Sequence, residues 1–227
     1  MDSKAIKKEN KFRRTRLSKT GNAREAIGAI SKKSDTYILT FGQFSLIDSL
    51  ITILEQTGPA HVDISTWTAA SAHLEKSQEL MEDEKILSLR LILDGSFVNR
   101  QPEYYYHMKK IYGDDCIRHI GTHAKFMLIY NDIYKIVVRT SMNLNENPRL
   151  ENIEISEDEN FLNFMKEIVD QVFSEIKVNT KSQLTPLLPG MEDFNSKKHI
   201  ELVEPKTTKI KSEKLHEPRT SHTIKIL

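Results

Sequence analysis

The sequence has little cysteine and no long apolar segment, and both deficits exclude classes of protein. Cys116 is the single cysteine among 227 residues, so no internal disulfide and no thiolate cage for zinc can form. No apolar run approaches the roughly 20 residues that a membrane-spanning helix needs, and the basic first residues lack the apolar stretch of a secretion signal. Because nothing in the chain needs oxidation to fold, we expect a cytoplasmic protein with no membrane association.

Charge is unevenly distributed although the formal net charge is only +1. The nets are +8 for residues 1–34, −10 for residues 35–180 and +3 for residues 181–227. The sequence therefore predicts a basic, largely flexible arm over 1–34, one domain over 35–178 and an extended polar tail over 179–227. A cationic arm favours polyanions, and DNA is the expected partner. The basic residues expected to bind nucleic acid are Lys7, Lys8, Lys11, Arg13, Arg14 and Arg16. A solvated leader without a partner is the alternative.

Apolar periodicity predicts the order of secondary structure within the domain. Strands are expected over 36–41, 62–67, 86–93, 115–120, 123–130, 133–141 and 150–155. Helices are expected over 23–30, 45–56, 69–81, 102–112 and 161–176. The dipeptide Asn131-Asp132 is typical of a tight hairpin turn. Strands that alternate with helices and then form a hairpin predict an α/β fold, with a mixed β-sheet flanked by helices.

Polar side chains gather around this predicted hairpin. Side chains two residues apart share a face of a strand, so His123 and Lys125 point the same way, as do Ser141 and Asn143. A turn at Asn131-Asp132 places 123 near 140 and 125 near 138. An imidazole, an amine, a hydroxyl and an amide then meet at the strand ends, and this set suits phosphodiester chemistry. Lys125 and Asn143 can hold the non-bridging oxygens, while neutral His123 can attack phosphorus. Glu154 on the next strand is the candidate carboxylate behind the imidazole.

These residues resemble the signature of the phospholipase D superfamily, which is His-x-Lys, then Gly-Ser-x-Asn, then an Asn-x-Glu strand. The matching segments are His123-Ala124-Lys125, Thr140-Ser141-Met142-Asn143 and Asn152-Ile153-Glu154. The resemblance spans roughly residues 35–178. It implies a phospholipase D-like α/β/α sandwich and a phosphodiesterase or nuclease that forms a phosphohistidine without metal or cofactor. Family enzymes assemble one site from two signature copies, so a single copy implies a homodimer in which two His123 side chains face each other.

The sequence departs from the family pattern in three places. Tyr130 stands where the family has an aspartate, Thr140 stands where it has a glycine, and the spacing from histidine to serine is about three residues longer. A phospholipase D-like dimer that binds nucleic acid or protein without turnover is therefore the alternative function. Several residues keep two interpretations: Asn143 and Asn145 can shape a turn, Trp67 can pack in the core or line a cleft, and Tyr104–Tyr106 can stack on bases or form a half-buried helix face.

Overall fold

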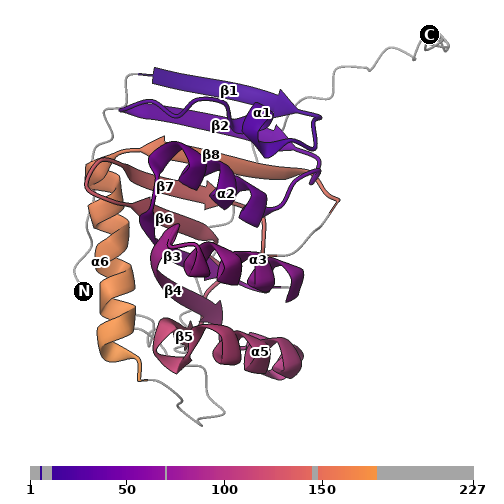
Figure 1. Cartoon of the computed structure of the whole chain (residues 1–227), viewed down its shortest axis with the longest axis vertical. Helices are drawn as coiled ribbons and strands as arrows, with labels where there is room; N and C mark the ends of the chain where they lie inside the picture. The colour runs from indigo at the N-terminus through magenta and orange to yellow at the C-terminus, as the bar shows by residue number, and fades with distance from the viewer. Residues whose placement is uncertain (1–5, 7–11, 70, 145–147, 178–227) are drawn as a thin grey trace, which may run out of the picture. The chain divides into compact units, whose positions relative to one another are not determined.

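An eight-stranded mixed sheet organises the part of the chain that the computed structural model describes, which is residues 6, 12–69, 71–144 and 148–177. The order across the sheet is β1-β2-β8-β7-β6-β3-β4-β5 (Figure 1). The strands are β1 (Phe12–Ser18), β2 (Ser34–Thr40), β3 (Ala60–Thr66), β4 (Ile86–Asp94), β5 (Ile117–Ile120), β6 (Phe126–Tyr130), β7 (Lys135–Thr140) and β8 (Glu151–Glu157). The pairs β1–β2, β3–β4 and β4–β5 are parallel and the remaining pairs antiparallel. The predicted fold class is confirmed.

Helices cover both faces of the sheet. They are α1 (Ala23–Ile27), α2 (Leu46–Thr57), α3 (Ser71–Glu82), α4 (Phe97–Arg100), α5 (Pro102–Tyr112) and α6 (Glu159–Glu175), with a 3-10 turn over Asp114–Cys116. Buried side chains of α1, α2, α3 and α5 share one apolar core with one face of the sheet. Those of α6 form a second core with the opposite face (Figure 1). Within the described residues, no helix is long and apolar enough to cross a membrane.

Local sequence signals account for where these helices begin and end. Ser45 caps α2, because its Oγ accepts from Asp48 N at 3.1 Å while Asp48 Oδ2 accepts from Ser45 N at 2.9 Å. Gly58, at φ 75°, ends the same helix. Pro102 opens α5, where its missing N–H costs nothing. The expected strands and helices are present with boundaries that differ by a few residues.

The expected flexible arm is wrong for Phe12–Ser18, which form β1, whereas the helix expected over 23–30 is present as α1. Alternate side chains of β1 hold α1 against the sheet, because Arg14 donates to Ala29 O and Arg16 Nη1 donates to Glu25 O and Ala26 O at 3.1 Å. Arg16 therefore satisfies carbonyls in the last turn of α1, and Arg14 satisfies a carbonyl in the segment that follows it. Arg13 is largely exposed and lies 3.9 Å from Asp35. The other expected binding residues, Lys7, Lys8 and Lys11, and the tail over 179–227 lie outside the described residues.

The hairpin register differs by two residues from the prediction. Tyr130 pairs with Lys135, so the loop contains residues 131–134 instead of a two-residue turn. Asn131 Oδ1 explains the longer loop, because it accepts from Ile133 N at 3.0 Å and Tyr134 N at 2.8 Å. Lys125 consequently lies opposite Thr140, whose N donates to Lys125 O at 3.2 Å. An even shift keeps every side chain on its predicted face.

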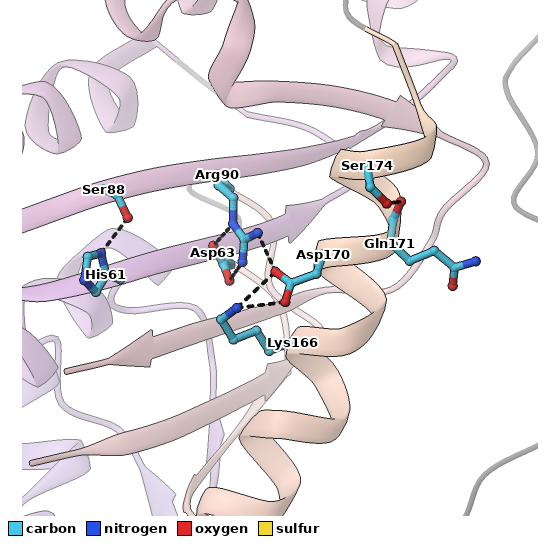
Figure 2. A network of polar contacts seen from close by, with 8 residues as sticks. All are labelled: His61, Asp63, Ser88, Arg90, Lys166, Asp170, Gln171 and Ser174. Carbon is cyan, nitrogen blue, oxygen red and sulfur yellow. Dashed lines mark hydrogen bonds and ion pairs between the residues drawn. The ribbon is translucent and has the colours of Figure 1, made fainter. Parts of the chain in front are cut away.

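A buried ion pair anchors α6 to the sheet (Figure 2). Asp63, only 1% exposed, receives two hydrogen bonds of 2.6 Å from its neighbour Arg90 on β4. Arg90 Nη1 also lies 2.7 Å from Asp170 Oδ1 of α6, and Lys166 Nζ lies 2.8 Å from Asp170 Oδ2. Burial opposes the charge on Arg90, but the hydrogen bonds to both carboxylates outweigh it and raise its pKa. Strand and helix are thus joined by fully paired charges.

Candidate active site

One end of the sheet collects most of the polar residues that the sequence singles out. Strands β3, β4 and β7 end here, while β6 and β8 begin here (Figure 1). His123 and Lys125 precede β6, and Ser141 and Asn143 follow β7. The antiparallel pairing of β6, β7 and β8 therefore brings three chain segments to the same edge.

Ser141 connects β7 to β8 through its hydroxyl. Its Oγ donates to the carboxylate of Glu151 and accepts from Asn152 N at 3.0 Å, and its own N donates to Asn152 O at 3.2 Å. Glu151 also acts on Lys125, which is half-buried. Burial lowers the pKa of the Lys125 amine, and the negative charge of Glu151 opposes this change. Ser141 and Glu151 are hydrogen-bonded, and together with Lys125, on which the Glu151 charge acts, they are called the polar group below.

Asn143 is positioned by the end of β3. Thr66, which is fully buried, directs its Oγ1 toward Asn143 Oδ1 at 3.5 Å and donates to Thr68 O at 2.9 Å. The next residue, Leu144, donates its N to Thr68 O at 3.2 Å. These contacts hold Asn143 and Leu144 against the end of β3.

His123 is exposed, and its backbone is fixed on both sides by short polar contacts. The strand predicted over 123–130 begins only at Phe126. Before it, Thr122 N donates to Asp94 Oδ2 at 3.2 Å, and Ser65 Oγ donates to Ala124 O at 2.8 Å. Lys125 Nζ donates to His123 O at 3.2 Å. These bonds replace the sheet ladder, so the imidazole projects from a constrained loop at the rim.

Glu154 does not occupy the position expected for it. It forms an ion pair with Arg139, its cross-strand neighbour on β7, and Arg139 lies 5.1 Å from the Phe161 ring of α6. Glu154 therefore faces α6, whereas Ile153 and Ile155 pack into the opposite core. The carboxylate at the site is Glu151, three residues earlier, because an odd displacement along a strand reverses the face. Glu151 is the first residue of β8 and lies opposite the end of β7, and this position is the signal that could have identified Glu151 from the sequence.

Two residues that depart from the family pattern have clear places in the structure: Tyr130 lies far from this polar group, and Thr140 lies next to Ser141. Tyr130 stands at the far end of β6, where the Lys166 amine lies 5.9 Å from its ring on the α6 face. Thr140 joins β7 to β8, because its Oγ1 donates to Asn152 O at 2.7 Å and accepts from Met142 N at 2.9 Å. Tyr105 is buried and Tyr106 exposed, which favours the helix-face interpretation of the tyrosines. Asn145 lies outside the described residues.

Structural comparison finds similar proteins at low sequence identity. Nuc of Salmonella typhimurium, a phospholipase D family member, is 11% identical over 57% of this chain and 90% of its own, with a TM-score of 0.44. NucT of Helicobacter pylori is 14% identical over 64% of this chain and 99% of its own (TM-score 0.46). The polyphosphate kinase of Porphyromonas gingivalis is 12% identical over 68% of this chain and 29% of its own (TM-score 0.48). The chain is similar in structure to phospholipase D family members. No protein-family model and no curated protein sequence matches it.

Proposed function

We propose that this protein hydrolyses phosphodiesters of nucleic acid through a phosphohistidine intermediate, in a site shared by two copies of the chain. The observation that supports the proposal is that His123, Lys125, Asn143 and the Ser141–Glu151 pair all stand at one end of the sheet, where Lys125 Nζ donates to the backbone O of exposed His123. This combination provides a nucleophile, a cation and neutral donors for a phosphate whose charge grows on attack.

The reaction divides into two displacements at phosphorus. The His123 imidazole attacks, a nitrogen–phosphorus bond forms, and the bond from phosphorus to the leaving ester oxygen breaks. His123 of the second copy protonates that oxygen as it leaves. This second imidazole then takes a proton from water, whose oxygen attacks the phosphohistidine, and the nitrogen–phosphorus bond breaks. The free imidazole and a phosphomonoester are the products.

The other residues of the site bind the phosphate or position the groups that bind it. Lys125 binds the non-bridging oxygens, and Glu151 helps the half-buried amine to stay charged. The Asn143 amide, positioned by Thr66, offers a neutral donor to the same oxygens. Ser141 fixes Glu151 and joins β7 to β8, so it positions the other groups. The exposed rim location of His123 supports a dimer whose two-fold axis passes between two imidazoles.

A cleavage assay in EDTA tests the proposal. The full chain is incubated with plasmid and with short single strands, beside His123→Asn and the control His61→Asn. His61, which contacts Ser88 Oγ at 2.7 Å on β4, is another sheet histidine outside the site. We expect cleavage by the wild type and His61→Asn and none by His123→Asn. Intact substrate with every protein would contradict the proposal. Excess His123→Asn protein, allowed to exchange subunits with the wild type, should suppress activity because mixed dimers lack one imidazole.

Binding without turnover is the second candidate function. Within the described residues, no carboxylate hydrogen-bonds to the His123 imidazole, and this observation favours a module that has lost its chemistry. In that case His123→Ala should leave DNA affinity unchanged in a gel-shift titration, and removal of residues 1–11 should lower it. Truncation at residue 11 keeps β1, whereas a cut at residue 22 would remove an edge strand and confuse binding with folding. Salt dependence measured at two concentrations reports the phosphate contacts.

A further inference from the structure

Trp67 and Arg100 form a stacked pair directly beside the proposed nucleophile. Trp67 follows the last residue of β3, and its ring centroid lies 6.0 Å from that of His123. The guanidinium of Arg100, the last residue of α4, lies 3.8 Å from the Trp67 ring centroid. Trp67 is half-buried and Arg100 is exposed, so the pair stands at the surface next to the site.

Arg100 is held in this position by hydrogen bonds on both sides of its guanidinium. Its Nη2 donates to Trp67 O at 3.1 Å, and its Nε donates to Ser96 Oγ at 3.0 Å. Ser96 in turn donates to the carboxylate of Asp94, which also accepts from Thr122 N next to His123. An exposed arginine side chain normally samples many rotamers, so this restraint fixes a planar cation at little further entropic cost when a ligand binds.

We propose that Trp67 and Arg100 form a stacking site for an unpaired nucleobase, which makes single-stranded nucleic acid the substrate class of the adjacent His123 site. The inference rests on the proposed function for the identity of that neighbouring site. A planar ring with a fixed guanidinium above it binds bases of every kind, because every base has a π-face. The positive charge of Arg100 also attracts the phosphate group that lies between this nucleotide and the phosphodiester to be cut.

The strand preference follows from geometry. In a duplex the faces of the bases are covered by their neighbours, so a base reaches a side-chain platform only after unstacking and unpairing. A single strand exposes the same faces without that cost. The Trp67–Arg100 pair therefore discriminates strands by base accessibility, while Lys125 and Asn143 bind the phosphate that both forms share.

Intrinsic fluorescence measures the stacking directly, because Trp67 is the single tryptophan of the chain. The full chain with His123→Asn is titrated at constant salt with a short oligothymidylate, its duplex with oligoadenylate, and an abasic strand of equal charge. We expect strong quenching by the oligothymidylate and roughly tenfold weaker responses to the other two. Equal quenching by the abasic strand, or no quenching by any probe, would overturn the stacking site.

Side-chain variants separate stacking from charge and from folding. Arg100→Lys keeps the charge but loses the plane, and it should weaken the oligothymidylate response by about fivefold. Arg118→Lys is the matched control, because Arg118 lies 4.7 Å from the ring of Phe173 on α6. With Trp67→Leu and Trp67→Phe, anisotropy of labelled strands replaces intrinsic fluorescence. The leucine variant should lose affinity for the strand with bases and retain it for the abasic strand, while the phenylalanine variant should keep most of both.

The outcomes distinguish this inference from the proposed activity. Quenching by oligothymidylate without cleavage by the wild-type chain would leave the stacking site standing and remove the activity. Equal cleavage of single strands, duplexes and abasic strands without quenching would leave the activity and remove the stacking site. An unchanged affinity in Trp67→Leu would count against the stacking site in either case.

Discussion

The charged network beneath α6 and the polar group at the end of the sheet use similar residues in opposite ways. Asp63 and Arg90 are enclosed and paired with each other, and Asp170 extends the pairing to the helix (Figure 2). His123 and Lys125 lie at a rim, one exposed and the other half-buried. Buried charges are stable only when they are paired, whereas groups that bind a ligand must keep some of their bonding capacity for it. The first region stabilises the fold, and the second is the one proposed to bind a ligand.

Removal of the buried carboxylate should produce the largest loss of stability. Asp63→Ala leaves the half-buried Arg90 without its main partner and should cost about 3–5 kcal/mol in the free energy of unfolding, measured by urea denaturation. Asp170→Ala is the control, because its side chain is 48% exposed and its loss should cost about 1 kcal/mol or less. Equal costs for the two substitutions would contradict the claim that burial of Asp63 sets its larger contribution to stability.

Removal of the site amine should affect turnover and spare stability. Lys125→Met deletes the cation proposed to hold the phosphate oxygens and should lower kcat/KM in the cleavage assay by roughly 100- to 1,000-fold. Burial already disfavours the charged amine of Lys125. The free energy of unfolding of the Lys125→Met variant should therefore equal or exceed that of the wild type. A substantial loss of stability in Lys125→Met would show that the two regions do not differ in this respect.

Glu151→Gln should alter the pH dependence of the same site. The carboxylate raises the pKa of Lys125 against the lowering effect of burial. Without that charge the pKa of the amine falls further, so activity at alkaline pH should be lost at a lower pH than in the wild type. Glu154→Gln, which removes the partner of Arg139 on the other face, should leave this limb of the pH–rate profile in place. A shift produced by Glu154→Gln alone would contradict the assignment of Glu151 as the carboxylate that acts on Lys125.

His119 should give the smallest effect, a dependence of stability on mildly acidic pH. Burial, with help from Lys109 and Arg118, lowers the pKa of this imidazole, while its Nε2 contacts the Tyr105 hydroxyl at 3.0 Å. The unfolded chain then binds the proton first as pH falls through the ordinary histidine value of roughly 6.5. The Tm should therefore decrease between neutral and mildly acidic pH, and His119→Gln should flatten this decrease. An unchanged slope in the variant would exclude His119 as its source.

Most elements of the fold were predictable because they have a local signal. Each signal lies inside or directly beside the element that it defines. Examples are the capping box at Ser45 and Asp48, Pro102 in the first turn of α5 and the apolar run of β4. The hairpin of β6 and β7 predicted that His123, Lys125, Ser141 and Asn143 stand at one end of the sheet, and an error of two residues in register left this end unchanged.

Contacts between distant segments decided what the sequence left open. The basic residues of β1 indicate a solvated arm in the sequence, yet Arg16 bonds to α1 and Arg14 to the segment after it. Glu154 and Glu151 are equally acidic in sequence, and only the pairing of β7 with β8 assigns Glu151 to Ser141. Trp67 and Arg100 lie 33 residues apart and meet because β3 and α4 finish at the same edge.

The sequence by itself determined most of the strands and helices, since backbone propensity and periodicity act over short distances. Only the tertiary structure decided which carboxylate joins the site, which arginines are structural and which ring stands beside the histidine. Those outcomes depend on the register and order of eight strands, and these are set by packing across the whole sheet.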